Sequence, residues 1–459
     1  MWQPSRRTFI FSAGASILAS SACRRAVPKW QGQKVGVAVV GLGLRGVGHC
    51  RAWSQIPGSR VVAVCDVNQQ SLDRGRSLVV RAGGQQPKAY QDFRQVLDDK
   101  EVQAVVLAVP NHWHALATIW ACQAGKDVYV EKPACHNPYE GAKMVEAARK
   151  YNRIVQVGSQ SRSMPHKRKA MELLHSGVIG KVYLAKGLCF KWRPSIGHQA
   201  DAPTPAWLDW DKFLGPAPMR TYNELRYRYN WNWFWDTGNG DIGNQGPHEM
   251  DIARWGLGKT GLPKSVVSTG GKYGVDDDQE TPNTQIATFD YGDSEIVFDV
   301  RGLSTGGEGG LGSDDYVRDV SAGMRKFLQR FGRLEGENVI GNLFYGSEGW
   351  MALNVHGFQV YKGHQSEKIM EGKSNLKDDT APHIENFLEA VRSRDCNCLN
   401  ADIEVGVTST NLIHLANASY RVKRLLKYDD TNHCFVNDDE ANAYLTRQYR
   451  PPYLVPDKV

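Results

Sequence analysis

The sequence has no long apolar run after its first 22 residues, whereas a transmembrane helix needs roughly 20 consecutive apolar residues. Its nine cysteines are scattered without a CxxC pair, which argues against a zinc-ribbon protein. Lysine and arginine form no long run, and the formal net charge is only +7. Since a nucleic-acid groove needs a broader basic stripe, we expect neither a nucleic-acid partner nor a transmembrane segment in the mature protein.

The chain does contain enough apolar material for two or three domains, because 41% of its 459 residues are hydrophobic. Most cysteines lie inside apolar segments such as 61–65, where a small buried thiol is expected. Cys396 and Cys398 are too close in sequence for a bridge between them to be favoured, and we assign no disulfide pairing. The composition predicts a globular, multidomain enzyme.

Residues 1–33 have the pattern of an export leader and linker. Arg6 and Arg7 precede an apolar run that ends at Ala22, as in a twin-arginine signal. The following Cys23 matches a lipobox only loosely, so lipid anchoring at Cys23 and cleavage to a soluble form both stay open. Loss of the two arginines would lower the charge from +7 to about +5. We therefore expect a periplasmic or otherwise exported protein.

Residues 34–157 alternate between predicted strands and helices. Apolar runs predict parallel strands at 35–40, 60–65, 104–109, 128–130 and 154–157. This alternation is typical of a doubly wound α/β Rossmann domain, whose ligands bind beyond the carboxyl ends of the strands.

A GxGxxG motif follows the first predicted strand and contains Gly41, Gly43, Leu44, Arg45 and Gly46. Asp66 ends the second strand 20 residues after Gly46, where an acidic side chain accepts hydrogen bonds from an adenine ribose. The glycines would allow a tight turn and close approach of the backbone to a pyrophosphate. The pattern predicts a dinucleotide site that favours NAD over NADP, although Arg45 leaves NADP open. A glycine turn in a cofactor-free domain is the alternative.

Three segments resemble the Gfo/Idh/MocA oxidoreductases, the family of glucose-fructose oxidoreductase and inositol dehydrogenase: the glycine motif, residues 108–114, and Glu131-Lys132-Pro133. The resemblance extends from about residue 34 to 430. It implies that Lys132 is a catalytic residue in contact with substrate and nicotinamide. It also implies a homodimer or homotetramer. The further cofactor-binding residues predicted here are Pro110, Asn111, His114, Glu131, Lys132 and Gln160.

A second segment, 238–251, resembles a glycine-rich landmark of the same family but departs from it at Asn244. Many members have a catalytic aspartate at that position, whereas His248 matches the usual histidine. Their spacing places both on one helical face. Because an amide cannot accept a proton as a carboxylate does, we expect Lys132 and His248 to share the acid–base role and Asn244 to bind substrate.

Residues 158–430 predict a second, α+β domain with an open, mainly antiparallel sheet. Alternating strands are predicted at 182–190, 264–269, 283–290 and 295–300, and long helices at 382–394 and 403–422. The loops 194–218 and 302–315 are long enough to be functional. Residues 431–459 form a C-terminal arm, expected to wrap the domain or a neighbouring subunit.

An aromatic run at 229–236 precedes the glycine-rich segment. Apolar rings beside amides and carboxylates suit a sugar, although core packing explains such rings equally well. The substrate-binding residues predicted besides Asn244 are Arg162, Tyr222, Trp231, Trp233 and Asp236. No metal site is predicted, since His112 and His114 have no evident third ligand.

Three functions are compatible with these motifs. The first is an NAD(P)-dependent oxidoreductase acting on a secondary hydroxyl of a sugar, glycoside or related polyol, with a tightly bound, recycled cofactor. The second is an NAD-dependent, redox-neutral glycoside hydrolase that works by oxidation, elimination, hydration and reduction. The third, which Asn244 supports and Lys132 opposes, is a non-catalytic sugar sensor. We rank them in this order.

Overall fold

The computed structural model describes residues 32–303, 339–375 and 380–459. Lys34–Val459 form one compact unit. The predicted export signal, Cys23 and most of the predicted loop 302–315 lie outside the described residues.

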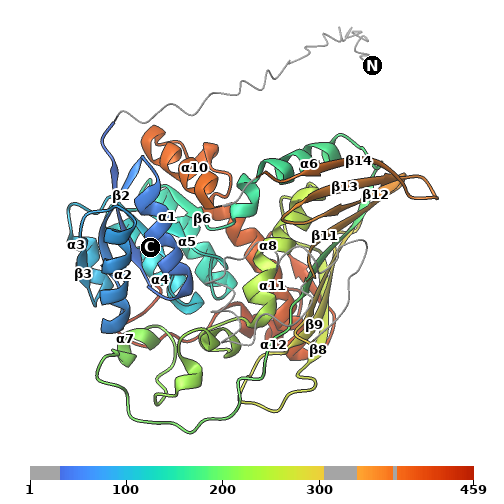
Figure 1. Ribbon diagram of the computed structural model, residues 1–459. Helices are drawn as coiled ribbons and strands as arrows, with labels where there is room; N and C mark the ends of the chain where they lie inside the picture. Colours follow the sequence, from blue (N-terminus) through green and yellow to red (C-terminus); the bar gives the residue numbers. More distant parts are fainter. Residues whose placement is uncertain (1–31, 304–338, 376–379) are drawn as a thin grey trace, which may run out of the picture. The chain divides into compact units, whose positions relative to one another are not determined.

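The amino-terminal part of this unit is a parallel sheet with the strand order β3-β2-β1-β4-β5-β6. Its edge strands β3 and β6 are labelled in Figure 1. Its strands are β1 (Val35–Val40), β2 (Ser59–Cys65), β3 (Lys88–Tyr90), β4 (Ala104–Leu107), β5 (Asp127–Val130) and β6 (Val155–Val157). The connecting helices are α1 (Leu44–Gln55), α2 (Gln69–Arg81), α3 (Phe93–Asp98), α4 (Asn111–Gln123) and α5 (Pro138–Lys150). Every residue of β1 is buried, as its unbroken apolar sequence requires. The predicted Rossmann fold is confirmed.

The second sheet has the order β14-β13-β12-β11-β7-β10-β9-β8-β15-β16. Its strands are β7 (Val182–Phe190), β8 (Ser265–Gly271), β9 (Thr284–Asp290), β10 (Glu295–Arg301), β11 (Val339–Gly346), β12 (Gly349–Leu353), β13 (Gly357–Lys362), β14 (Glu367–Lys373), β15 (Leu426–Asp429) and β16 (Cys434–Phe435). β7 and β10 pair in parallel, and the other described pairs of this sheet are antiparallel. The predicted open, mainly antiparallel sheet is thus confirmed.

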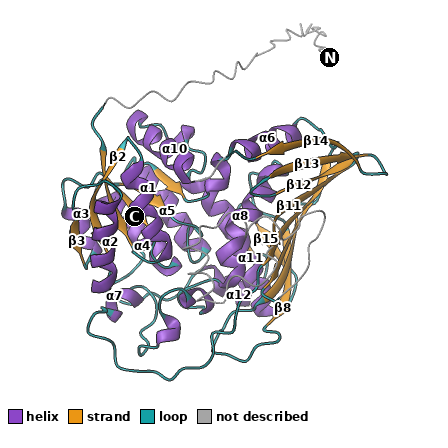
Figure 2. Ribbon diagram, viewed as in Figure 1, coloured by secondary structure: helices purple, strands orange, loops and turns teal. Residues whose placement is uncertain are grey.

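Helices α8 and α11 lie along one face of this sheet (Figure 2). The remaining helices are α6 (Pro165–His175), α7 (Trp210–Leu214), α8 (Gly240–Gly256), α10 (Thr380–Ser393), α11 (Ile403–Val422) and α12 (Asp439–Asn442). The 3-10 turns are η1 (Gln160–Ser163), η2 (Glu224–Arg226), η3 (Asn230–Trp233), η4 (Cys396–Cys398) and η5 (Ala443–Leu445). Met250 of α8, Leu412 of α11 and Phe298 of β10 are buried together in the core between them.

Two late segments of the chain pack into the first domain. Phe387 of α10 contacts the ring of Trp53 in α1 edge-on, with centroids 5.8 Å apart. From the C-terminal arm, Tyr453 and Val455 join the core that contains Leu107 of β4. The arm therefore wraps its own nucleotide domain, one of the two arrangements expected from the sequence.

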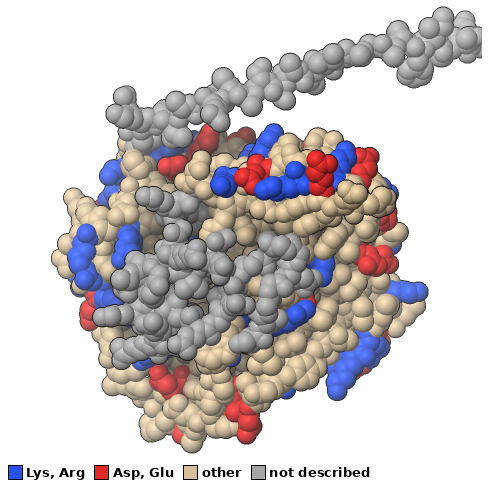
Figure 3. All heavy atoms as spheres, turned by 45° about the vertical axis from the view of Figure 1, so that its right-hand side comes forward, with Lys and Arg blue, Asp and Glu red and all other residues tan. Residues whose placement is uncertain are grey.

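The eight described cysteines are free, and five of them are buried. On the face drawn in Figure 3, basic and acidic side chains lie interspersed along the edges. Among the described helices none is long and apolar enough to cross a membrane. Within the same residues, no three His, Cys, Asp or Glu side chains gather as metal ligands.

Candidate active site

The glycine motif forms a turn that only glycine can build. Gly41 has a φ of +83°, and a Cβ there would lie 2.6 Å from the carbonyl oxygen of Ala108. A Cβ at Gly46 would lie 1.7 Å from the carbonyl oxygen of Gly41, so α1 can approach β1 only without a side chain. At Gly43 a Cβ would meet nothing within 4 Å, and no side chain caps α1. The backbone therefore presents an open helix N-terminus, which suits a pyrophosphate.

A cavity of about 620 Å³ opens at the carboxyl ends of β1, β2, β4 and β5. The predicted site residues that line it are Gly41, Gly43, Leu44, Arg45, Asp66, Pro110, Asn111, Glu131, Lys132, Trp231 and Asn244. Gly46, His114 and Gln160 do not line it, but His114 and Gln160 contact lining residues, namely Val109, Pro133 and Glu131. The position and the glycine cradle fit a dinucleotide as the occupant.

Asp66 lies at the end of β2 with its carboxylate fixed by the backbone. It accepts hydrogen bonds from the N–H groups of Leu42 at 2.6 Å and Asn68 at 2.8 Å. Burial raises the pKa of this carboxyl, and the two N–H groups oppose that rise. A carboxylate fixed here favours the free ribose hydroxyl of NAD over the phosphate of NADP.

Glu131 is the centre of a buried polar cluster. Its Oε1 lies 2.7 Å from Nε of Arg45, 2.8 Å from Nε2 of His49 and 3.2 Å from Nε2 of Gln160. Burial raises the pKa of Glu131, but Arg45 and His49 lower it more, to well below its usual value. The Arg45 guanidinium is thus paired with Glu131. Because that charge is already used, Arg45 is less suited to bind the additional phosphate of NADP.

Lys132 reaches from the end of β5 to helix α8. Its Nζ donates to the backbone oxygen of Asn244 at 2.7 Å and to Oδ1 of the same residue at 3.3 Å. Burial lowers the pKa of the Lys132 ammonium. The lowered pKa favours the neutral amine; in that form its two N–H groups would be used by Asn244 and its lone pair would be open to a proton.

Tyr229 fixes the orientation of Asn244. The phenol oxygen accepts a hydrogen bond from Nδ2 of Asn244 at 2.7 Å and from Arg193 at 3.3 Å. Arg193 is held in turn by a bidentate ion pair with Asp241, at 2.6 and 3.0 Å. Because Nδ2 faces Tyr229, Oδ1 faces Lys132. Sequence reasoning missed Tyr229 and Arg193 as site residues, although Tyr229 opens the aromatic run; no motif marks Arg193.

His248 lies one helical turn after Asn244, as their spacing predicted. Burial, and secondarily the charge of Lys132, lower the pKa of its ring to about 3. The histidine is therefore neutral at physiological pH. A neutral imidazole can hydrogen-bond a substrate hydroxyl as donor or acceptor, but a ring with so low a pKa is a weak base, so Lys132 is the better candidate to accept a proton.

Several other predicted residues are engaged within the protein. Arg162 forms a bidentate ion pair with Asp251 at 2.7 and 2.8 Å. Tyr222 donates to Glu224 and packs on Trp210. Five of the predicted catalytic and substrate-binding residues are not among those that line the described cavity: Arg162, Tyr222, Trp233, Asp236 and His248.

Trp233, Asp236 and His114 likewise have internal partners. Trp233 is buried beneath the guanidinium of Arg193, 5.2 Å from its ring centroid, and Asp236 pairs with Arg220. The two ring nitrogens of His114 lie 2.6 Å and 2.9 Å from the carbonyl oxygens of Pro133 and Val109. His114 thus ties together the two loops that carry Pro110 and Lys132.

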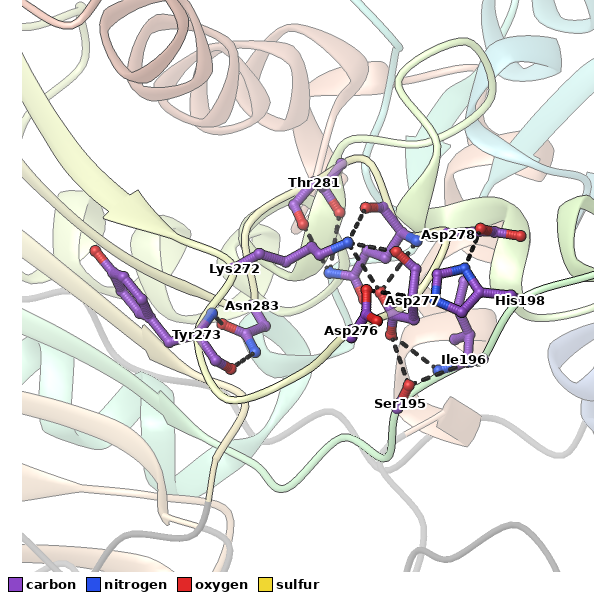
Figure 4. A network of polar contacts seen from close by, with 12 residues as sticks. Ser195, Ile196, His198, Lys272, Tyr273, Asp276, Asp277, Asp278, Thr281 and Asn283 are labelled. Carbon is purple, nitrogen blue, oxygen red and sulfur yellow. Dashed lines mark hydrogen bonds and ion pairs between the residues drawn. The ribbon is translucent and has the colours of Figure 1, made fainter.

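A polar network anchors the start of the long loop 194–218, at Ser195, Ile196 and His198 (Figure 4). The carboxylate of Asp277 accepts hydrogen bonds from Ser195 Oγ at 3.1 Å and the N–H of Ile196 at 3.0 Å. Asp278 accepts one from His198 Nδ1 at 2.6 Å. Asp277 and Asp278 lie in the segment that connects β8 and β9. This segment also contacts the aromatic run, because the N–H of Glu280 donates to the carbonyl of Trp233 at 3.0 Å. The start of this loop is therefore anchored to the segment between β8 and β9, and its later residues Lys212 and Phe213 line the cavity.

Comparison with known families agrees with this geometry. A model of an oxidoreductase family with an NAD-binding Rossmann fold matches residues 35–159. The model of that family's C-terminal α/β domain matches residues 163–301 and 348–455. The chain belongs to the Gfo/Idh/MocA oxidoreductase family.

Individual Gfo/Idh/MocA relatives match shorter parts of the chain. The levoglucosan dehydrogenase of Pseudarthrobacter phenanthrenivorans is 24% identical over 242 residues, 52% of this chain and 55% of that protein. A glycosyl hydrolase family 109 protein of Saccharopolyspora erythraea is 29% identical over 160 residues, 34% of this chain and 35% of that protein. The chain therefore spans about half or less of the length of these two curated relatives.

A solved Gfo/Idh/MocA fold covers far more of the chain. The structure of levoglucosan dehydrogenase in complex with NADH and levoglucosan superposes with a TM-score of 0.64. The match has 16% identity and covers 86% of this chain and 99% of that one. At this identity the likeness establishes the shared fold.

Replacing Asn244 with aspartate is expected to move the rising limb of the pH profile of kcat/KM to higher pH. A carboxylate beside Nζ would stabilise the ammonium form of Lys132 and raise its pKa, so the neutral base would form only at higher pH. The measurement is kcat/KM against pH for both proteins. Asn244→Gln, which adds no charge, is the control. A limb that stays in place in Asn244→Asp would contradict Lys132 as the base.

Proposed function

We propose that the chain is an NAD-dependent oxidoreductase that acts on a secondary hydroxyl of a sugar, glycoside or related polyol. The observation that carries the proposal is the Lys132 amine, held by two oxygens of Asn244 at the wall of a dinucleotide-type cavity. The curated relative named levoglucosan dehydrogenase supports the substrate class.

The residues of this chain would bind and orient the substrate and remove one proton. When bound, NAD supplies the hydride acceptor for the carbinol carbon. Lys132 Nζ takes the hydroxyl proton, and Asn244 keeps the nitrogen directed at the site. The neutral ring of His248 holds the hydroxyl oxygen by a hydrogen bond. Trp231, which lines the cavity, offers an apolar face to the sugar ring.

The direct test is a panel of sugars, glycosides and polyols incubated with the chain and NAD. Formation of NADH in proportion to a ketone product, located by NMR, is the expected result. If no compound reduces NAD, while calorimetry shows that NAD and a sugar both bind, the oxidoreductase proposal is wrong.

The second candidate is the redox-neutral glycoside hydrolase. The relative named glycosyl hydrolase family 109 protein favours it, as does the proton-removing position of Lys132. A nitrophenyl glycoside distinguishes the two candidates. Release of nitrophenol at constant NAD content would favour the hydrolase, whereas stoichiometric NADH would favour the oxidoreductase.

We also propose that residues 1–33 direct export by the twin-arginine route, with Cys23 as a lipid anchor or the leader removed by cleavage. An exported oxidoreductase would meet no pool of free NAD, so a tightly bound cofactor recycled within each turnover fits this location. Arg6→Lys/Arg7→Lys should keep the protein in the cytoplasm, and mass spectrometry of exported protein would reveal a lipid at Cys23.

For the oligomeric state of the protein we propose a homodimer or homotetramer, which light scattering can measure.

A further inference from the structure

The C-terminal arm forms part of the wall of the nucleotide cavity. Tyr453 lines the cavity and is only 5% exposed. Its ring packs edge-on against Trp113 of α4, with centroids 5.4 Å apart and an interplanar angle of 74°. The last residues of the chain therefore add an aromatic wall to a cavity built mainly from the first domain.

Arg450 and Tyr453 hold the same carboxylate, that of Asp211 in helix α7. Arg450 Nη1 donates to Asp211 Oδ1 at 2.6 Å, and the Tyr453 hydroxyl donates to Oδ2 at 3.1 Å. Arg450 Nε also donates to the carbonyl of Gly215, just beyond α7, at 3.1 Å. Two side chains of the arm thus hold both ends of this short helix, and we call Asp211, Arg450 and Tyr453 the clasp.

Helix α7 is itself part of the cavity wall. Lys212 and Phe213 line the cavity, and Trp113 Nε1 lies 3.0 Å from each of their carbonyl oxygens. A Cβ at Gly215 would lie 2.2 Å from the Trp113 ring, so the contact needs glycine there. The arm, α7 and α4 therefore pack against one another at this wall, and the clasp joins the arm to α7.

This wall lies at the adenosine end of a dinucleotide site. Asp66 occupies the position that binds the adenine ribose in such folds. The first two residues of helix α3, Phe93 and Arg94, line the same cavity, and Arg94 forms an ion pair with Asp92, which lines it too. Aromatic rings beside a guanidinium suit a flat heteroaromatic base next to anionic phosphates.

We propose that the clasp closes the adenosine end of the cavity and sets the rate at which NAD leaves. This inference rests on the NAD binding of the proposed function. The nucleotide can leave past α7 only after that helix parts from Trp113, and the bonds to Asp211 hold it in place. Because affinity changes within one site lie mostly in the dissociation rate, weakening the clasp should accelerate release.

The test is a stopped-flow chase of bound NADH by excess NAD, followed by NADH fluorescence. Arg450→Ala removes the charge-assisted hydrogen bond to Asp211 together with the hydrogen bonds to the carbonyls of Gly215 and Ala217, and is expected to speed release by about 10-fold or more. Tyr453→Phe removes one neutral donor, keeps the ring, and is expected to speed release by about 3-fold. The double variant Arg450→Ala/Asp211→Asn should release NADH little faster than Arg450→Ala, because without Arg450 the charge of Asp211 has lost its partner, and the amide oxygen of an asparagine can still accept from Tyr453.

Arg424→Ala is the matched control, because it breaks an exposed ion pair with Asp438 away from the cavity. It should leave the release rate unchanged, and thermal unfolding checks that each variant is folded. If Arg450→Ala does not fold, Tyr453→Phe alone decides the matter. Equal NADH release rates in the parent chain and the folded variants would contradict the proposal that the clasp sets the rate of NAD release. A parent chain that binds no NADH would instead overturn the proposed function, and the clasp with it.

Discussion

Replacing Lys132 with methionine is expected to lower kcat by about 10³-fold or more while NADH still binds. Methionine keeps an unbranched side chain of similar length but has no nitrogen lone pair to take the hydroxyl proton. The two acceptor oxygens of Asn244 lose their donor, yet the glycine turn and Asp66, which hold the nucleotide, are untouched. The measurements are kcat with the best substrate and NADH affinity by fluorescence.

Lys132→Arg separates the charge of Lys132 from its basicity. Arginine keeps a cation at this position but is not deprotonated in proteins, so it cannot act as a base. We expect it to be nearly as inactive as methionine. Lys100→Met, at an exposed position of the same domain, is the control and should retain activity. A Lys132→Arg variant with near-normal kcat would show that position 132 supplies only charge.

The nucleotide half of the site was predictable because its determinants are local in sequence. Uninterrupted apolar runs identify the buried parallel strands, and the glycines that follow the first run mark a turn that no other residue can form. Asp66 lies directly after a strand, so its position at the sheet edge follows from the fold alone. The helix at 403–422 was likewise predicted with the bounds of α11.

The substrate half depends on contacts between distant segments, which the sequence pattern does not contain. Arg162 carries no local sign that it pairs with Asp251, 89 residues away. The sequence alone shows Asn244 only as a departure from the family's aspartate. In the fold, its Nδ2 donates to Tyr229 and its Oδ1 accepts from Lys132. Strand β14 has no buried face that would give an alternating apolar pattern, which explains why it was not anticipated.

The glycine turn provides the second large effect, because two of its glycines have different reasons to be glycine. At Gly46 an added Cβ would overlap the backbone oxygen of Gly41 at 1.7 Å. At Gly43 the backbone is extended, with a φ of −67°, and the space around an added Cβ is open within 4 Å. The protein itself therefore forbids a side chain at Gly46, whereas only a ligand would forbid one at Gly43.

Gly46→Ala is expected to destabilise the fold by about 3 kcal/mol, because backbone atoms cannot move aside cheaply, and to abolish NADH binding. Gly43→Ala is expected to leave the unfolding free energy almost unchanged but to weaken NADH binding by about 10-fold or more, since its methyl group would stand between the backbone and the pyrophosphate. Gly48→Ala, at an exposed position inside α1 with open space around it, is the control and should stabilise the helix by about 0.5–1 kcal/mol. Denaturant unfolding and NADH titration of the three variants measure both quantities. If Gly43→Ala binds NADH as tightly as the parent chain, no pyrophosphate lies against this turn, and the assignment of the cavity to a dinucleotide fails.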